Sequence, residues 1–298
     1  MSLKPLPYFG WVKPSASGGG KLDISIEGNP LTAEQYKEVL RLMKFVAWVR
    51  PFLIDYLVLD SWYGEIVRLP EHLGDKLARH PNLIEKTGTF LIQSHVIVEK
   101  AVNGFFSAAA TFRDRLLART NSRKGSELQC FTSELYDAEP AYRLGYNLRN
   151  FGLHSDAIIH AIPMRRSGTD EVEVEVTIAI SRDRLIRSLD VNERVRTDLG
   201  GMPSSIDLLA LCETYQECMA QIFAKLLTTR AEELAFAFGL ANVLRNGARG
   251  LPKDATPILF LEPPSGEADD KFEFTSKTEL FSLDELSILA DLFPALRS

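Results

Sequence analysis

The spacing of apolar residues along the chain predicts a mainly helical protein. Between Thr89 and Arg119 the apolar positions alternate steps of four and three, the period of one face of a long α-helix. An earlier helix is expected to start at Thr32, which can form a capping box with Gln35. Pro51 is expected to end or kink that helix, because proline lacks the amide hydrogen of a helix interior.

Three further helices follow from the same kind of pattern. Pro140 suits the first turn of a helix that leads through Tyr142. Another helix is expected to begin at residue 204 or 205 and to run to about residue 246. A capping box of Ser282 and Glu285 predicts a final amphipathic helix.

A change of period predicts one β-hairpin within this helical chain. Residues 172–180 alternate apolar and polar side chains, as in a half-buried strand. Residues 157–164 are the expected partner strand, connected across residues 165–170. The hairpin is therefore placed at about residues 157–181.

These elements predict a mainly α fold, a helical bundle with an inserted or appended antiparallel β-hairpin. Residues 1–30 are rich in proline and contain three successive glycines, so an irregular N-terminal arm is expected. Residues 31–250 form the predicted helical domain. Residues 251–298 form an acidic C-terminal segment with a short helix.

Charge is unevenly distributed along the chain. The formal net charge is -6, but residues 262–291 contain nine acidic residues and two lysines, a sum of -7, so the remainder sums to +1. A basic tract precedes the helix at Pro140, and it either follows a phosphate backbone or forms a solvated helix face. Its basic residues are Arg113, Arg115, Arg119, Arg123 and Lys124.

Composition indicates a cytoplasmic protein with no membrane partner. No apolar run is long enough to span a bilayer, and the N-terminus lacks the pattern of a secretory signal. Three cysteines are an odd number, which argues against a disulfide framework. No metal or cofactor is expected, because the histidines show no metal-ligand spacing. These histidines are His72, His80, His95 and His160.

The chemically distinctive motif is Arg149-Asn150 followed by His154. It resembles the signature of the HEPN superfamily, helical proteins many of which are metal-independent endoribonucleases in toxin, antiphage and RNA-processing systems. The resemblance covers about a dozen residues directly. It implies catalytic roles for Arg149 and His154, with Asn150 orienting the phosphate or the histidine.

This pair of residue types suits RNA cleavage without a cofactor, because the ribose 2′-hydroxyl supplies the nucleophile. An imidazole, with an ordinary pKa of ~6.5, can accept or donate the proton near neutral pH. A guanidinium can bind two phosphate oxygens and offset the charge of the transition state. RNA is thus the expected partner, with Tyr142, Tyr146 and Arg143 as candidate substrate-binding residues alongside Arg119, Arg123 and Lys124.

Helix geometry predicts that two copies complete the site. On a regular helix Arg149 and His154 project ~140° apart, so one helix aims them poorly at a single phosphate. A homodimer is therefore expected, as the resemblance also implies. Gly152 is a departure that would leave His154 on a loop if it ended the helix.

Other interpretations of the motif remain open. The chain is either a HEPN-type nuclease or a non-catalytic dimeric scaffold that binds nucleic acid or a partner protein. In a third interpretation the motif is accidental and the chain is a helical interaction protein. If the chain is a toxin-like nuclease, an antitoxin or other partner is expected, and the acidic C-terminal segment is a candidate RNA mimic.

Overall fold

Long α-helices dominate the structure, in agreement with the spacing of apolar residues. The computed structural model describes residues 7–16, 22–80, 83, 89–120, 125–154, 157–167, 173–188, 191–246, 255–260, 278–280 and 282–297. The helices are α1 (Ala33–Arg79), α3 (Thr89–Arg119), α4 (Glu127–Ala138), α5 (Pro140–His154), α6 (Arg182–Arg187), α7 (Glu193–Gly200), α8 (Leu208–Thr228), α9 (Ala231–Asn246), α10 (Asp284–Leu292) and a 3-10 turn (Pro294–Arg297). Within these ranges, no helix is both long and apolar enough to cross a bilayer.

Small antiparallel sheets accompany the helices. The strands are β1 (Tyr8–Pro14), β2 (Leu22–Pro30), β3 (Met164–Ser167), β4 (Glu173–Val176), β5 (Ala179–Ser181), β6 (Ser205–Asp207), β7 (Thr256–Phe260) and β8 (Thr278–Leu280). The chain divides into two compact units. Unit 1 comprises residues 1–53 and 227–298, and unit 2 comprises residues 54–226.

The helix boundaries test the sequence predictions closely. The predicted helix from Thr89 to Arg119 is α3, and its bounds are confirmed. The capping box of α1 forms, because the Thr32 amide donates to Gln35 Oε1 at 2.9 Å and the Gln35 amide donates to Thr32 Oγ1 at 3.2 Å. Pro51 does not end the helix, since α1 continues through it to Arg79. Burial of the residues that follow it, such as Phe52, offsets the lost hydrogen bond.

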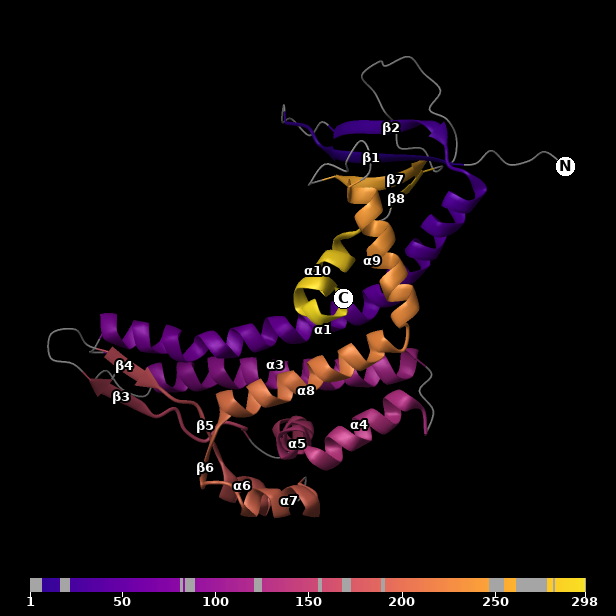
Figure 1. The fold of residues 1–298 in the computed structure, drawn as a ribbon. Coiled ribbons are helices and arrows are strands. Elements are labelled where there is room, and N and C mark those ends of the chain that lie inside the picture. Colours follow the sequence, from indigo (N-terminus) through magenta and orange to yellow (C-terminus); the bar gives the residue numbers. More distant parts are fainter. Residues whose placement is uncertain are drawn as a thin grey trace. The chain divides into compact units, whose positions relative to one another are not determined.

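Unit 2 is built on α3 and α8 packed against the part of α1 beyond residue 53 (Figure 1). Tyr56 of α1 contacts Phe112 of α3 and Phe223 of α8, with ring centroids 5.6 Å and 5.1 Å away. Gly104 lets α3 approach α1, because a Cβ there would lie 2.7 Å from the Trp62 ring. These aromatic contacts form a core against which α4 and α5 can pack.

The β-hairpin of unit 2 forms, and part of its predicted first strand takes part in the pairing. β3 pairs antiparallel with β4, with Met164 opposite Val176. An isolated antiparallel bridge between Ala161 and Ala179 continues the same register, although regular strand begins only at Met164. The helix predicted from residue 204 or 205 also begins later, since residues 205–207 form β6 and pair with β5. Pairing places Ile180 opposite Ile206, and both are buried. The apolar residues of β5 and β6 are visible in the sequence, but the pairing of these two strands is not.

Unit 1 overturns the prediction of an irregular N-terminal arm. β1 and β2 join β7 and β8 in a sheet of order β2-β1-β7-β8. The apolar run at Ile258 pairs with β1 at Gly10, and Val12 and Ile258 are buried together. The described parts of residues 1–30 and 251–298 are therefore not separate segments, because strands far apart in sequence complete one sheet.

The C-terminal helix α10 also belongs to unit 1. Arg50 of α1 pairs with Glu285 at 2.5 Å, and Arg245 of α9 donates to Ser287 Oγ at 2.6 Å. The predicted capping box does not form, because Ser282 Oγ accepts the Asp284 amide and the N-cap residue is Leu283. Most of the acidic stretch, residues 261–277, lies outside the described residues.

Candidate functional site

Helix α5 carries the whole Arg-Asn-His motif at its C-terminal end. The helix begins at Pro140, as predicted, and continues without a break to His154. Its first half packs into unit 2, where Gly145 allows close approach, because a Cβ there would lie 2.7 Å from the Tyr215 ring. Gly152 therefore does not end the helix, and the motif lies on regular helical backbone.

Gly152 is needed for the contact between α5 and α3. A Cβ at this position would lie 2.5 Å from Asn103 Oδ1 on α3 and 2.9 Å from Ile158 Cδ1. Both distances are shorter than real Cβ contacts allow. The glycine inside the motif thus lets the end of α5 pack tightly, and it serves packing rather than a helix stop.

A carboxylate of α3 holds the chain that follows the motif. Glu99 Oε1 accepts the Ile158 amide at 2.8 Å and the Asn103 side-chain amide at 2.9 Å, and Glu99 Oε2 accepts the Ile159 amide at 3.0 Å. Sequence analysis missed this role. The available signal was a polar pair, Glu99 and Asn103, spaced by one turn on a largely apolar helix.

The motif side chains themselves lie at the edge of the core. Arg149 and Asn150 are partly exposed, and neither has a hydrogen-bond or ion-pair partner within the described portion of the protein. His154 is the last residue of α5, and its side chain is not among those that the structure describes. That the side chains of Arg149 and His154 come close together therefore stays a prediction.

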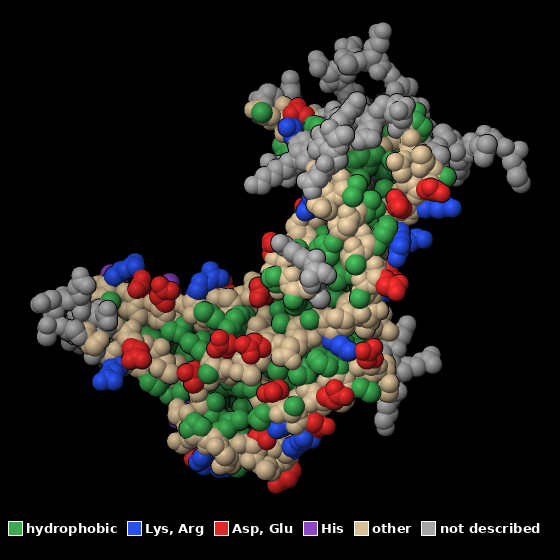
Figure 2. Space-filling view, viewed as in Figure 1, with side chains coloured by type: hydrophobic (Ala, Val, Ile, Leu, Met, Phe, Trp, Pro, Cys, Tyr) green, Lys and Arg blue, Asp and Glu red, His purple; other side chains and the backbone are tan. Residues whose placement is uncertain are grey.

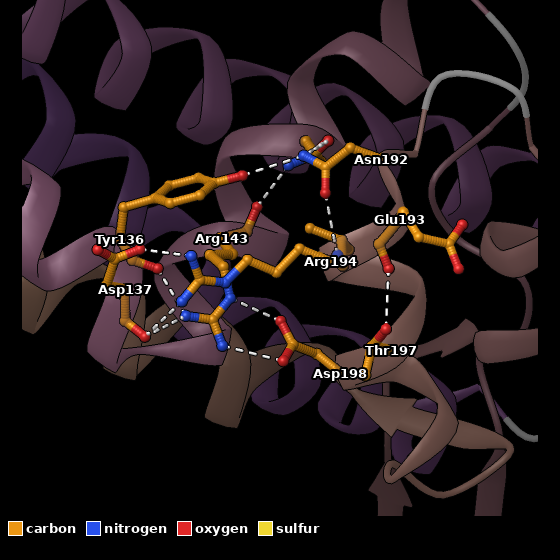
Figure 3. A network of polar contacts seen from close by, with 10 residues as sticks. Tyr136, Asp137, Arg143, Asn192, Glu193, Arg194, Thr197 and Asp198 are labelled. Carbon is orange, nitrogen blue, oxygen red and sulfur yellow. Dashed lines mark hydrogen bonds and ion pairs between the residues drawn. The ribbon is translucent and has the colours of Figure 1, made fainter.

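Arg143 has a different position from the one expected of a substrate-binding residue. It is 4% exposed, and its guanidinium donates to both carboxylate oxygens of Asp198 on α7, at 2.6 Å and 2.9 Å (Figure 3). It also donates to the backbone carbonyls of Tyr136 and Asp137 at the end of α4. Hydrogen bonding to Asp198 raises the pKa of Arg143. We therefore correct its role: it joins α4, α5 and α7.

Neighbouring residues complete this network. Asn192 donates to the Tyr136 hydroxyl at 3.0 Å and caps α7 by accepting the Val195 amide (Figure 3). Arg194 pairs with Asp137 at 2.5 Å. The first turns of α5 are thus fixed from two sides by polar contacts, which positions the motif at the other end of the helix.

The two tyrosines of α5 differ in exposure. Tyr142 is 2% exposed and its ring lies 5.8 Å from that of Tyr215, so it packs in the core and is not exposed as a substrate-binding residue. Burial raises the pKa of Tyr142, and the nearby positive charge of Arg113 lowers it in part. Tyr146 is partly exposed, with the Arg113 guanidinium carbon 4.2 Å from its ring centroid.

The predicted basic tract is divided between two sides of α3. Arg115 and Arg119 both pair with Asp55 of α1, at 2.8 Å and 2.6 Å, whereas Arg113 lies against α5. Arg123 and Lys124 lie outside the described residues. Acidic side chains are scattered over the face of unit 2 that Figure 2 shows, so this face is not a continuous basic surface. Asp55 neutralises part of the tract from a distant point in the sequence.

The end of α5 can therefore offer to an anionic ligand a guanidinium and a carboxamide that have no partner among the described residues. Across the described ranges, no group of three histidine, cysteine or acidic side chains is arranged to hold a metal ion. No family model matches the chain, and no curated protein or solved structure matches it significantly. Its function must therefore be argued from the site itself.

Proposed function

We propose that the protein is a metal-independent endoribonuclease of the HEPN type, with Arg149, Asn150 and His154 at its active site. One observation carries this proposal: Arg149 and Asn150 lack protein partners among the described residues, whereas Arg143, Arg115 and Arg119 of the same unit are all paired. An unpaired, partly exposed arginine beside an unpaired asparagine is suited to binding a phosphate.

The proposed reaction needs only groups of the RNA and of this chain. A base, His154 of one copy, takes the proton of the ribose 2′-hydroxyl, and the 2′-oxygen forms a bond to phosphorus. The bond from phosphorus to the 5′-oxygen breaks, and that oxygen takes a proton from the imidazolium formed in the first step, directly or through water. Arg149 offsets the charge on the phosphoryl oxygens. The products are a 2′,3′-cyclic phosphate and a 5′-hydroxyl.

The proposal includes a homodimer, because His154 is on the same continuous helix as Arg149. On that helix the two side chains project ~140° apart, so a second copy must bring its own motif to the same phosphate. The tight packing of Gly152 against α3 holds the helix end in place for such an approach.

The first experiment compares RNA cleavage by the wild type, Arg149→Ala and His154→Ala in the presence of EDTA. Both variants are expected to lose at least ~100-fold in rate. Arg115→Ala is the matched control, because it removes an exposed arginine of the same unit that is already paired with Asp55. Normal cleavage by either motif variant, or no cleavage by the wild type on any RNA, would refute the nuclease.

A second experiment tests the shared site. Equal amounts of the inactive Arg149→Ala and His154→Ala chains are unfolded, mixed and refolded. If an active site takes its arginine and histidine from different copies, about a quarter of wild-type activity should return, from heterodimers with one intact site. Absence of any recovery, with heterodimers present, would contradict the shared site.

The alternative is a non-catalytic dimeric scaffold that binds nucleic acid or a partner protein. It is favoured by four apolar side chains on α3, between 43% and 65% exposed, which are Leu91, Ile92, Val96 and Ile97. Exposed apolar groups of this kind often contact other proteins. Filter binding at several salt concentrations, without cleavage, would support this scaffold if RNA is retained and the products stay uncut.

A further inference from the structure

A cavity of about 510 Å³ lies beside Tyr146, in the groove where α3, α4 and α5 meet. α3 contributes Arg113, α4 contributes Gln129, Ser133 and Tyr136, and α5 contributes Tyr146. The buried ring of Tyr142 forms part of its wall. The volume is within the range of small-molecule sites in proteins.

Flat groups line this cavity. The Tyr136 and Tyr146 rings lie 6.3 Å apart at an interplanar angle of 87°, and the Arg113 guanidinium covers Tyr146 at 4.2 Å. Aromatic rings and arginine guanidinium planes are the groups on which proteins stack unpaired bases. The arginine also brings a positive charge to the cavity wall, where its side chain is 18% exposed, and Asp114, 2.6 Å away, offsets part of that charge.

Polar groups are present beside the flat ones. Ser133 is exposed, and its hydroxyl donates to the Gln129 carbonyl. The Gln129 carboxamide has no hydrogen-bond partner in the part of the chain that the structure describes. A carboxamide both donates and accepts, so it can bond to the edge of a base.

The cavity is aligned with the motif. Tyr146 and Asn150 are one helical turn apart on the same side of α5, a rise of ~6 Å. An RNA strand bound at the motif would therefore bring a neighbouring nucleotide beside Tyr146. This places a ligand site with stacking, charge and hydrogen-bonding groups next to the proposed scissile phosphate.

We infer that this cavity binds one unpaired nucleotide of an RNA strand, with its base against Tyr136 and Tyr146, its edge at Gln129 and its phosphate near Arg113. The inference rests on the proposed function in one respect: the bound nucleotide is taken to be part of an RNA strand and not a free mononucleotide. It does not depend on cleavage, because binding uses none of the motif residues.

The test measures equilibrium binding of the four nucleoside 5′-monophosphates and of a single-stranded RNA about six nucleotides long. The full chain carries His154→Ala throughout, so that no RNA is cut. Ligand-detected NMR follows the mononucleotides, and fluorescence anisotropy follows the labelled strand. At least one mononucleotide is expected to bind, and the strand is expected to bind at least tenfold more tightly.

Two tryptophan substitutions give a matched pair. Ser133→Trp should fill the cavity and weaken both ligands about tenfold, whereas Glu134→Trp, at the next exposed position but not lining this cavity, should leave binding unchanged. Circular dichroism melting confirms that both variants fold. Tyr146→Leu should weaken binding about tenfold through lost stacking.

The outcomes separate the two proposals. No binding of any mononucleotide, or equal binding by the two tryptophan variants, would overturn the cavity as a nucleotide site. A mononucleotide that binds as tightly as the strand would overturn RNA as its source. Binding as expected by the His154→Ala chain, together with a wild type that never cuts RNA in the cleavage experiment, would keep the nucleotide site and reject the nuclease.

Discussion

The two halves of α5 carry arginines in opposite surroundings. Arg143, in the first half, is buried and makes hydrogen bonds to Asp198 and to two carbonyls of α4. Arg149, in the second half, is partly exposed and has no partner among the described residues. The same residue type thus anchors the helix at one end and, at the other, makes no polar contact with the described residues.

This difference separates stability from function along one helix. Arg143 and its hydrogen-bond partners hold α5 in place, and the donors and acceptors that they use on one another are not available to a substrate. The polar groups of Arg149 and Asn150 make no hydrogen bond to the described residues, so stability does not explain why these residue types are present. The substitutions below test this contrast, from the largest expected effect on stability to the smallest.

Arg143→Ala should destabilise the protein by about 3–5 kcal/mol, because it leaves the largely buried Asp198 carboxylate without its partner. Arg149→Ala should change the free energy of unfolding by less than about 0.5 kcal/mol. Urea unfolding followed by circular dichroism measures both. Equal losses for the two variants would show that the halves of α5 do not differ as described.

Gly152→Ala should cost about 1–3 kcal/mol, because the new Cβ would overlap Asn103 and Ile158. Gly239→Ala on α9 is the matched control. A Cβ there meets no atom within 4 Å, so alanine should stabilise its helix by up to about 1 kcal/mol. The same sign for both substitutions in thermal unfolding would contradict the close approach of α5 to α3.

Glu99→Ala should cost about 1–2 kcal/mol, because it leaves the Ile158 and Ile159 amides without their acceptor. Hydrogen exchange at these two amides should accelerate more than exchange in the middle of α3. Glu99→Gln keeps one acceptor oxygen and should give a smaller acceleration. Unchanged exchange at both amides in Glu99→Ala would show that another group holds this segment.

Tyr142→Phe should change stability by less than about 1 kcal/mol at neutral pH, since it removes only a hydroxyl. Burial raises the pKa of Tyr142 above its ordinary value of 10. Its neutral form therefore stabilises the fold fully below pH 10, and this contribution falls as the pH rises from 10 through the folded-state pKa. Above pH 10 the unfolding free energy of the wild type should fall more steeply than that of Tyr142→Phe. Parallel curves would contradict the raised pKa.

The sequence predicted best where the signal is local. The bounds of α3, the capping box at Thr32 and the start of α5 at Pro140 follow from residues that contact one another within a turn or two. It failed where strands pair across the chain. β1 depends on β7, and neither has enough apolar alternation to identify its partner.

The site shows the same limit. The sequence identified Arg149, Asn150 and His154 as a motif, because their spacing is a local property. It also grouped Arg143 and Tyr142 with them, although both side chains are buried. It missed Glu99, whose partners at Ile158 and Ile159 are some sixty residues away.

By itself, the amino-acid sequence determined features such as the bounds of α3 and the start of α5, and which residues could carry chemistry, because helix capping, periodicity and side-chain type are local. Only the tertiary structure decided which of the described arginines are paired, and which, such as Arg149, have no partner among the described residues. That choice depends on whether a distant carboxylate, such as Asp198 for Arg143 or Asp55 for Arg119, is brought within hydrogen-bonding distance. Long-range packing makes this decision, and the order of residues along the chain does not reveal it.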